Sequence, residues 1–183
     1  MVVTAMTTEY GPDYLILGLP RHRTAWLACW LCTIGHTCYH EGITAAHSLA
    51  DYNERTAGVG DATTALSQVD VHRLWPAAKV IVIDGSVDKV MAWSEREGIN
   101  VPRDAIETLD KALREMDAVH VSFEELDDQL DAIYEYLFGA EMTAMQVMET
   151  RRLQQLNVQL KDSRLHYRDR VLRVHSEMMG ETK

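Results

Sequence analysis

The segment from residue 17 to residue 27 gathers the side chains best suited to chemistry. It reads Leu-Gly-Leu-Pro-Arg-His-Arg-Thr-Ala-Trp-Leu, so two guanidinium groups, an imidazole and a hydroxyl group follow one another from Arg21 to Thr24. Guanidinium and hydroxyl groups bind the oxygens of phosphate and sulfate. A helix beginning at Thr24 adds unpaired backbone N–H groups and the positive end of its dipole. The segment therefore predicts an anion-binding loop.

The polar side chains of this loop suggest separate roles. Arg21 would stay charged and offset negative charge that develops on a bridging oxygen during group transfer. Arg23 would hold equatorial oxygens or replace missing backbone contacts, and His22 would either donate to the same anion or face solvent. In the alternative without a ligand, both arginines are exposed turn residues and Thr24 only caps the helix.

Short apolar runs and amphipathic segments predict the elements that position the loop. Continuous apolar runs typical of buried strands occupy residues 14–19, 79–83 and 118–123. Apolar residues at helical spacing occupy 24–33, 87–97, 103–117 and 124–138. Strands that alternate with helices predict an α/β fold around a mostly parallel sheet.

The chain divides into a lead-in (1–12), an α/β domain (13–160) and a C-terminal helix (161–183). Beyond Glu141 the pattern is mainly helical, and an apolar stripe recurs through Val171, Leu172, His175, Met178 and Met179. This helical extension could pack on its own domain or pair with a second copy in a homodimer.

Two polar segments supply further candidates for chemistry. Residues 35–42 read Gly-His-Thr-Cys-Tyr-His-Glu-Gly, and His40 or Glu41 could accept a proton from an acceptor hydroxyl or serve as a structural hydrogen-bonding group. Residues 58–64 are expected to form a second loop that opens a helix, where Asp61 either caps the helix or holds an acceptor.

The anion loop resembles the 5′-phosphosulfate-binding loop of the sulfotransferase family, a branch of the P-loop fold. That loop runs Pro, Lys or Arg, Ser, Gly, Thr, Thr, Trp directly after the first strand. Matching positions here are Pro20, Arg21, Thr24 and Trp26, whereas Ser, Gly and the second Thr are replaced by His22, Arg23 and Ala25. Small proteins with an Arg-x-Arg-Thr-Ala-Trp loop are also familiar from bacteriophage genomes.

Two weaker similarities extend this resemblance to residues 13–140. Residues 119–139 are similar to the late strand and helix of sulfotransferases, and residues 79–94 resemble the strand, turn and helix that bind the nucleotide 3′-phosphate. At the family's Arg and Ser positions this chain has Asp84 and Ala92. A carboxylate repels a phosphate dianion, and Ser94 could replace the missing Ser only with a shift of helical register.

The resemblance implies a three-layer P-loop NTPase-like fold and sulfuryl transfer from 3′-phosphoadenosine 5′-phosphosulfate to a small-molecule or nucleotide acceptor. An alternative is a small P-loop kinase using ATP and magnesium, with Thr24 and Asp84 at the metal. A third possibility, from a different class, is a non-catalytic module that binds a nucleotide or a protein, which could be encoded by a phage.

Composition narrows the classes of function. The chain has 183 residues and a net charge of −10; residues 95–149 carry 4 basic and 15 acidic side chains, and residues 151–183 carry 8 and 4. Extensive nucleic-acid binding is therefore not expected.

Hydropathy and cysteine content indicate where the protein works. No apolar run has the length of a membrane span. The 3 cysteines favour a reducing cytoplasm, which would be that of the host if the protein is viral. A zinc site is not expected either, because the ligand spacing of familiar zinc fingers and ribbons is not matched by Cys29, Cys32, His36, Cys38 and His40.

Overall fold

The computed structural model describes residues 10–162. The strands are β1 (Tyr14–Gly18), β2 (Cys38–His40), β3 (Gly60–Thr63), β4 (Lys79–Asp84) and β5 (Val119–Ser122). The helices are α1 (Thr24–Thr33), α2 (Leu49–Thr56), α3 (Val71–Leu74), α4 (Val87–Glu97), α5 (Arg103–Arg114), α6 (Leu130–Phe138) and α7 (Ala144–Asp162). Two short 3-10 helices, η1 (Gly42–Ala45) and η2 (Leu126–Asp128), complete the described elements.

The five strands form one parallel sheet with β1 at its centre, in the order β2-β3-β1-β4-β5. Leu17 of β1 pairs with Thr63 of β3, and Gly18 pairs with Ile83 of β4. The carboxyl ends of the three central strands therefore meet at one edge. After β1 the chain forms β2 and β3 on one side of β1, and it then forms β4 and β5 on the other side. Open α/β sheets bind ligands at such a switch in direction, and the loop of residues 19–23 lies there.

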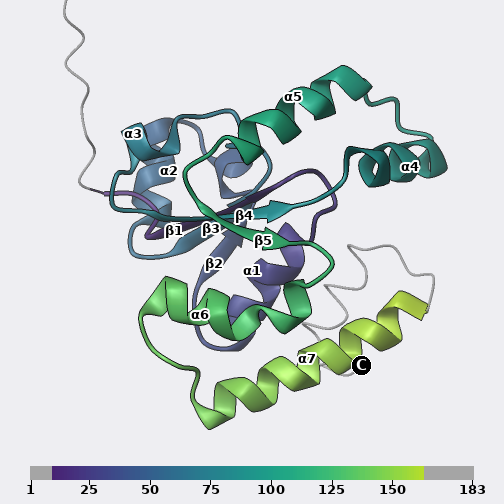
Figure 1. The fold of residues 1–183 in the computed structure, drawn as a ribbon. Coiled ribbons are helices and arrows are strands. Elements are labelled where there is room, and N and C mark those ends of the chain that lie inside the picture. Colours follow the sequence, from purple (N-terminus) through teal and green to yellow (C-terminus); the bar gives the residue numbers. More distant parts are fainter. Residues whose placement is uncertain (1–9, 163–183) are drawn as a thin grey trace, which may run out of the picture.

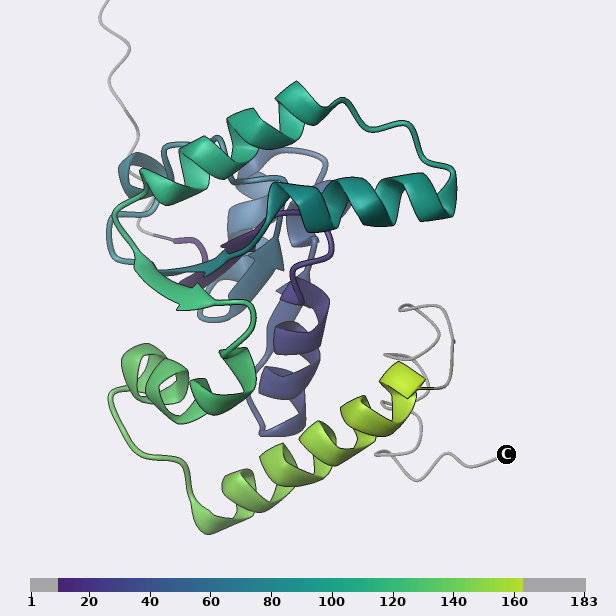
Figure 2. The ribbon, with the colours of Figure 1, turned by 45° about the vertical axis from the view of Figure 1, so that its right-hand side comes forward.

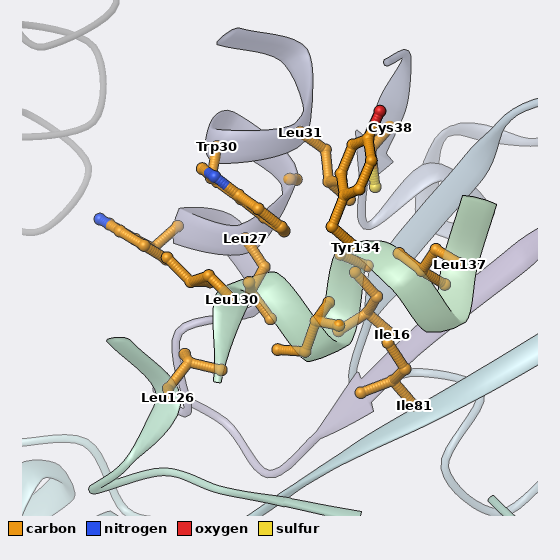
Figure 3. Packing of buried hydrophobic residues seen from close by; sticks show 14 of the residues in the cluster. Ile16, Leu27, Trp30, Leu31, Cys38, Ile81, Leu126, Leu130, Tyr134 and Leu137 are labelled. Atoms are coloured by element: carbon orange, nitrogen blue, oxygen red, sulfur yellow. The ribbon is translucent and has the colours of Figure 1, made fainter. Parts of the chain in front are cut away.

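Helices cover both faces of the sheet, which gives three layers (Figures 1 and 2). Successive residues of β1 point to opposite faces: Leu15 and Leu17 pack toward α2, α3, α4 and α5, while Tyr14 and Ile16 pack toward α1 and α6. The second of these cores is drawn in Figure 3, where α1 and α6 meet over Ile16 and Ile81. Burial on both faces explains the continuous apolar sequence of β1 and β4.

The α/β class predicted from sequence is confirmed, and the sheet is parallel throughout. Predicted and observed bounds agree for α1 and α4. The predicted helix over residues 124–138 is interrupted, because η2 precedes α6.

The prediction that the loop of residues 58–64 opens a helix is wrong, because Gly60–Thr63 is strand β3. A Cβ at residue 60 would lie 1.8 Å from the ring of Tyr14, its partner in β1. Glycine therefore allows this strand to pack beside the tyrosine. Asp61 lies inside the strand and caps no helix.

The last described helix, α7, packs back on its own domain. The indole N–H of Trp30 in α1 donates to Thr150 Oγ1 at 2.9 Å, and Leu153 is buried in the same core. The predicted apolar stripe of residues 171–179 and almost all of the predicted C-terminal helix lie outside the described residues. Within residues 10–162, no helix has the length and apolar character needed to span a membrane.

Candidate anion-binding site

The loop after β1 has an unusual backbone conformation. Arg21 and Arg23 have φ values of 71° and 65°, in the left-handed region that residues other than glycine rarely adopt. Arg23 is the N-cap of α1, and its side chain makes no capping hydrogen bond. The start of α1 thus lies at the switch point with no side-chain cap from its N-cap residue, which is the arrangement that favours an anion.

His22 supports this loop from inside the protein. Its side chain is 2% exposed, so the solvent-facing alternative is wrong. Nδ1 donates to the carbonyl oxygens of Leu19 and Pro20, each at 3.2 Å, and Nε2 accepts from the backbone N–H of Ser86 at 3.1 Å. Burial lowers the pKa of His22. The ring is therefore held neutral with both nitrogens engaged, and it is not placed to donate to an anion.

Arg23 is committed to contacts within the protein. Its Nη2 lies 2.6 Å from Asp127 Oδ1 in η2, and its guanidinium carbon lies 4.2 Å from the centre of the Trp26 ring. Only 9% of the side chain is exposed. The ligand-free alternative, in which Arg23 is an exposed turn residue, is therefore wrong for this arginine. Its guanidinium contacts Asp127 and Trp26, so the predicted role of holding equatorial anion oxygens is not the one that these contacts favour.

Arg21 is the exposed arginine of the loop. Its guanidinium carbon lies 4.9 Å from the centre of the Trp93 ring in α4, a cation–π contact that links the loop to that helix. The exposed position leaves Arg21 as the loop cation best placed to meet an anion arriving from solvent.

Thr24 and His40 are brought together by the sheet. The Thr24 side chain is buried at the first position of α1, and its Oγ1 lies 3.4 Å from Nε2 of His40 at the end of β2. Partial desolvation lowers the pKa of His40, against the opposing effect of the Glu41 and Asp61 carboxylates. This shift favours the neutral imidazole, the form that can accept a proton, beside the start of α1.

Glu41 is anchored to the end of β3. Its Oε2 accepts from Thr63 Oγ1 at 2.6 Å, and its Oε1 accepts from the Thr64 N–H at 3.0 Å. Both carboxylate oxygens of Glu41 already accept hydrogen bonds. Glu41 therefore fits the alternative of a structural hydrogen-bonding group better than that of a proton acceptor.

Asp61 has no exposed surface. Its Oδ1 accepts from the Gly42 N–H at 2.9 Å, and its Oδ2 accepts from the Tyr52 hydroxyl at 3.1 Å. Burial raises the pKa of this carboxyl, although these hydrogen bonds oppose the change. Asp61 therefore positions the turn that follows His40 and does not itself reach solvent.

The remaining residues of the predicted anion set occupy different places. Pro20 and Ala25 are half-buried in the loop and the first turn of α1, and Trp26 is 4% exposed beneath Arg23. Ser94 is buried in α4, where its hydroxyl donates to the carbonyl oxygen of Ile99. Ser94 therefore has a structural role, because its hydroxyl bonds to the segment that follows α4.

Asp84, the metal ligand of the kinase alternative, ends β4 beside His120. Its Oδ1 lies 2.9 Å from His120 Nδ1, and His120 Nε2 donates to the Met116 carbonyl oxygen at 3.2 Å. Partial burial disfavours the charged imidazole, but these two acceptors outweigh it and raise the pKa of His120. No hydrogen bond joins Asp84 to Thr24 within the described part of the chain.

The three cysteines do not gather a metal-binding set. Cys38 is buried, Cys29 is half-buried, and the Cys32 thiol donates to the carbonyl oxygen of Cys38 at 3.4 Å. Burial raises the pKa of Cys29 to about 11, which keeps this thiol protonated. Across residues 10–162, no group of three or more His, Cys, Asp or Glu side chains is arranged to hold a metal ion.

Two residues around the loop were missed by sequence reasoning. Asp127 and Trp93 contact the two arginines, and Asp127 is 104 residues from Arg23. The sequence around Asp127 and Asp128 contains no local pattern that predicts a contact between Asp127 and Arg23.

Comparisons of the chain with protein-family models, with curated proteins and with solved structures found no match. What the protein does must therefore be inferred from its own residues and their geometry.

Proposed function

We propose that the loop of residues 19–23 and the start of α1 bind the phosphate or sulfate end of a nucleotide, and that the protein is a sulfotransferase-like enzyme. In this proposal a sulfuryl group moves from a nucleotide phosphosulfate to a hydroxyl or amine of a small-molecule or nucleotide acceptor. The observation that carries the proposal is the contact of 3.4 Å between Thr24 Oγ1 and His40 Nε2. It supports a proton acceptor adjacent to an anion site.

Each side chain would contribute a distinct part of the reaction. His40 would take the proton of the acceptor hydroxyl through Nε2. The acceptor oxygen would bond to sulfur as the bond from sulfur to the donor phosphate oxygen breaks, and that phosphate would keep the electron pair. Arg21 would offset the charge on the leaving oxygen, and Thr24 would orient the transferred group.

The residues present fit the 5′ end of such a donor better than a 3′-phosphate. Asp84 stands where the sulfotransferase resemblance expects an arginine, and its carboxylate is already paired with His120. Ala92 stands where that resemblance expects a serine, and the Ser94 hydroxyl is used by Ile99. We therefore restrict the proposal to recognition through the 5′ phosphosulfate group.

Thermal unfolding of the full chain tests the proposal. Adenosine 3′,5′-bisphosphate and sulfate should raise the melting temperature, and Arg21→Ala should remove that increase while leaving the ligand-free melting temperature nearly unchanged. Arg152→Ala, an exposed arginine on α7, is the matched control and should keep the increase. Release of the bisphosphate from the phosphosulfate donor in the presence of candidate acceptors then measures turnover.

The other outcomes are equally informative. A magnesium-dependent increase with ATP, without one from the bisphosphate, would favour the kinase alternative. Stabilisation by the bisphosphate without consumption of donor would favour the non-catalytic nucleotide-binding module. An equal increase in wild type and Arg21→Ala would remove the loop from the binding site.

A further inference from the structure

The turn that follows His40 is fixed in an uncommon backbone conformation by one carboxylate. Glu41 has a φ of 58°, in the left-handed region where a non-glycine residue persists only when its surroundings hold it. Its Oε2 accepts from Thr63 Oγ1 at 2.6 Å and its Oε1 accepts from the Thr64 N–H at 3.0 Å. Both bonds join the end of β2 to the end of β3. In the described part of the chain, the other non-glycine residues with positive φ belong to the loop of residues 19–23. The strain is therefore concentrated around the candidate site.

A second carboxylate holds the same turn from inside the protein. Asp61 of β3 has no exposed surface. Its Oδ1 accepts from the Gly42 N–H at 2.9 Å, and its Oδ2 accepts from the Tyr52 hydroxyl at 3.1 Å. A Cβ built on Gly42 would lie 3.2 Å from Asp61 Oδ2, so the carboxylate lies close against the backbone of the turn. Residues 41 and 42 are thus each tied to the neighbouring strand by a carboxylate.

The strand that carries His40 depends on these ties. β2 has three residues and lies at the edge of the sheet, where its one strand neighbour is β3. His40 is its last residue and pairs with Ala62. On the other side, His40 Nε2 lies 3.4 Å from Thr24 Oγ1 of α1. A proton acceptor works only within hydrogen-bond reach of its donor, so the place of this imidazole must be set closely. The residues directly after it are the ones that the two carboxylates fix.

The same carboxylates favour a positive charge on the imidazole. Burial lowers the pKa of His40, whereas the Glu41 and Asp61 carboxylates act to raise it. The polar group that His40 meets from α1 is the uncharged Thr24 hydroxyl. A proton taken by Nε2 would convert the ring to an imidazolium, and both negative charges would stabilise that form. The turn is therefore suited to a histidine that gains a proton.

We propose that Glu41 and Asp61 are positioning residues that hold the His40 imidazole against the start of α1 for proton transfer. This inference rests on the proposed function, in which His40 takes the proton of the acceptor hydroxyl through Nε2. Neither carboxylate receives that proton, because both oxygens of each already accept hydrogen bonds. The two side chains act through the imidazole and do not touch the acceptor.

Nuclear magnetic resonance of the full, ligand-free chain tests the placement of His40. The wild type should show a nuclear Overhauser effect between the His40 ring and the Thr24 methyl group. Glu41→Gly adopts a φ of 58° without strain but removes both bonds to β3, and it should lose this effect. Glu54→Gln removes an exposed carboxylate on the neighbouring helix α2 and should keep it. An unchanged effect in Glu41→Gly would overturn the proposal.

Titration of the same imidazole provides a second test, which does not depend on how well Glu41→Gly folds. Glu41→Gln and Asp61→Asn keep the size of the side chain and remove one negative charge. Each should lower the pKa of His40, and Glu54→Gln should leave it unchanged. Carboxylates with only a structural role would change the melting temperature without changing this pKa. That result in both neutral variants would overturn the proposal.

Turnover separates this inference from the proposed function. Glu41→Gly should reduce kcat about a hundredfold, as expected for a misplaced catalytic group, and should keep the stabilisation by adenosine 3′,5′-bisphosphate. Full turnover in Glu41→Gly would overturn the inference and leave the proposed function standing. A wild type that neither binds the bisphosphate nor consumes donor would overturn the proposed function. The nuclear Overhauser effect and the titration would then decide by themselves whether the two carboxylates hold His40.

Discussion

The ring of His22 occupies the space in which a side chain at residue 85 would stand. A Cβ built on Gly85 would lie 1.8 Å from both Cδ2 and Nε2 of His22. The loop after β1 and the turn after β4 therefore fit together only because residue 85 has no side chain. The neutral imidazole completes this fit by accepting the Ser86 N–H.

Gly85→Ala should therefore disrupt the anion loop. We expect a loss of about 2–3 kcal/mol in the free energy of unfolding, as in other overpacked sites, together with loss of anion-dependent stabilisation. Gly98→Ala is the control, since a Cβ there meets nothing within 4 Å and φ is 67°. It should cost only about 1 kcal/mol and leave anion binding intact. Chemical denaturation of both variants with and without sulfate makes the comparison, and equal behaviour would contradict the described fit.

Asp127→Asn should destabilise the loop through Arg23. The variant removes the carboxylate that lies 2.6 Å from a guanidinium that is only 9% exposed. We expect a loss of about 1–2 kcal/mol, reduced from the value for a fully buried pair because Asp127 is 37% exposed. Asp128→Asn, the exposed neighbour in η2, should change stability by less than about 0.5 kcal/mol. Urea titration of both variants measures the difference, and similar values would mean that the ion pair contributes little.

Thr24 and His40 should separate anion binding from catalysis. If His40 is the proton acceptor, His40→Gln should reduce turnover about 10²–10⁴-fold while preserving anion-dependent stabilisation. Thr24→Val should reduce both if its hydroxyl contacts the anion, as in the proposed site. Donor consumption and thermal unfolding are measured side by side. Full turnover in His40→Gln would rule out this imidazole as the base.

His120 should contribute stability that depends on pH. Its folded-state pKa is raised by Asp84 and the Met116 carbonyl oxygen. The contribution is therefore complete below the ordinary value near 6.5 and is lost as pH rises through the raised value. We expect His120→Gln to cost about 0.5–1 kcal/mol at about pH 5.5 and less at about pH 9.

Comparison with this variant isolates His120 from the other imidazoles. Burial lowers the pKa values of His22, His36 and His40. The folding stability that these groups contribute is therefore lost as pH falls. Denaturation of wild type and His120→Gln at both pH values gives the difference due to residue 120. A larger difference at the higher pH would contradict the assigned charge.

The amino-acid sequence determined the elements whose signals are local. A buried strand over residues 14–19 was predicted from its apolar run, and helices over residues 24–33 and 87–97 were predicted from helical spacing. The structure has β1, α1 and α4 at these places. Gly98 adopts the left-handed conformation that ends a helix. The central β1–loop–α1 unit and the α/β class followed from these signals.

The strands β2 and β3 could not be predicted in the same way. Residues 38–40 and 60–63 are short and largely polar or small, and they become strands by pairing with one another and with β1. Parallel pairing joins segments far apart in the chain, so no local pattern reports it. For this reason Asp61 was expected in a loop, as a helix cap or a residue that holds an acceptor, whereas it is a buried residue of β3.

Within the candidate site, the sequence by itself determined which side chains stand in the loop, but tertiary structure decided what each contacts. Residues 20–26 are contiguous, so a strand followed by a helix places them together. That Arg23 faces Asp127 and that Thr24 meets His40 depends on where η2 and β2 lie. Hydrogen bonds and ion pairs act over only a few ångströms, and it is the packing of the whole chain that sets those distances.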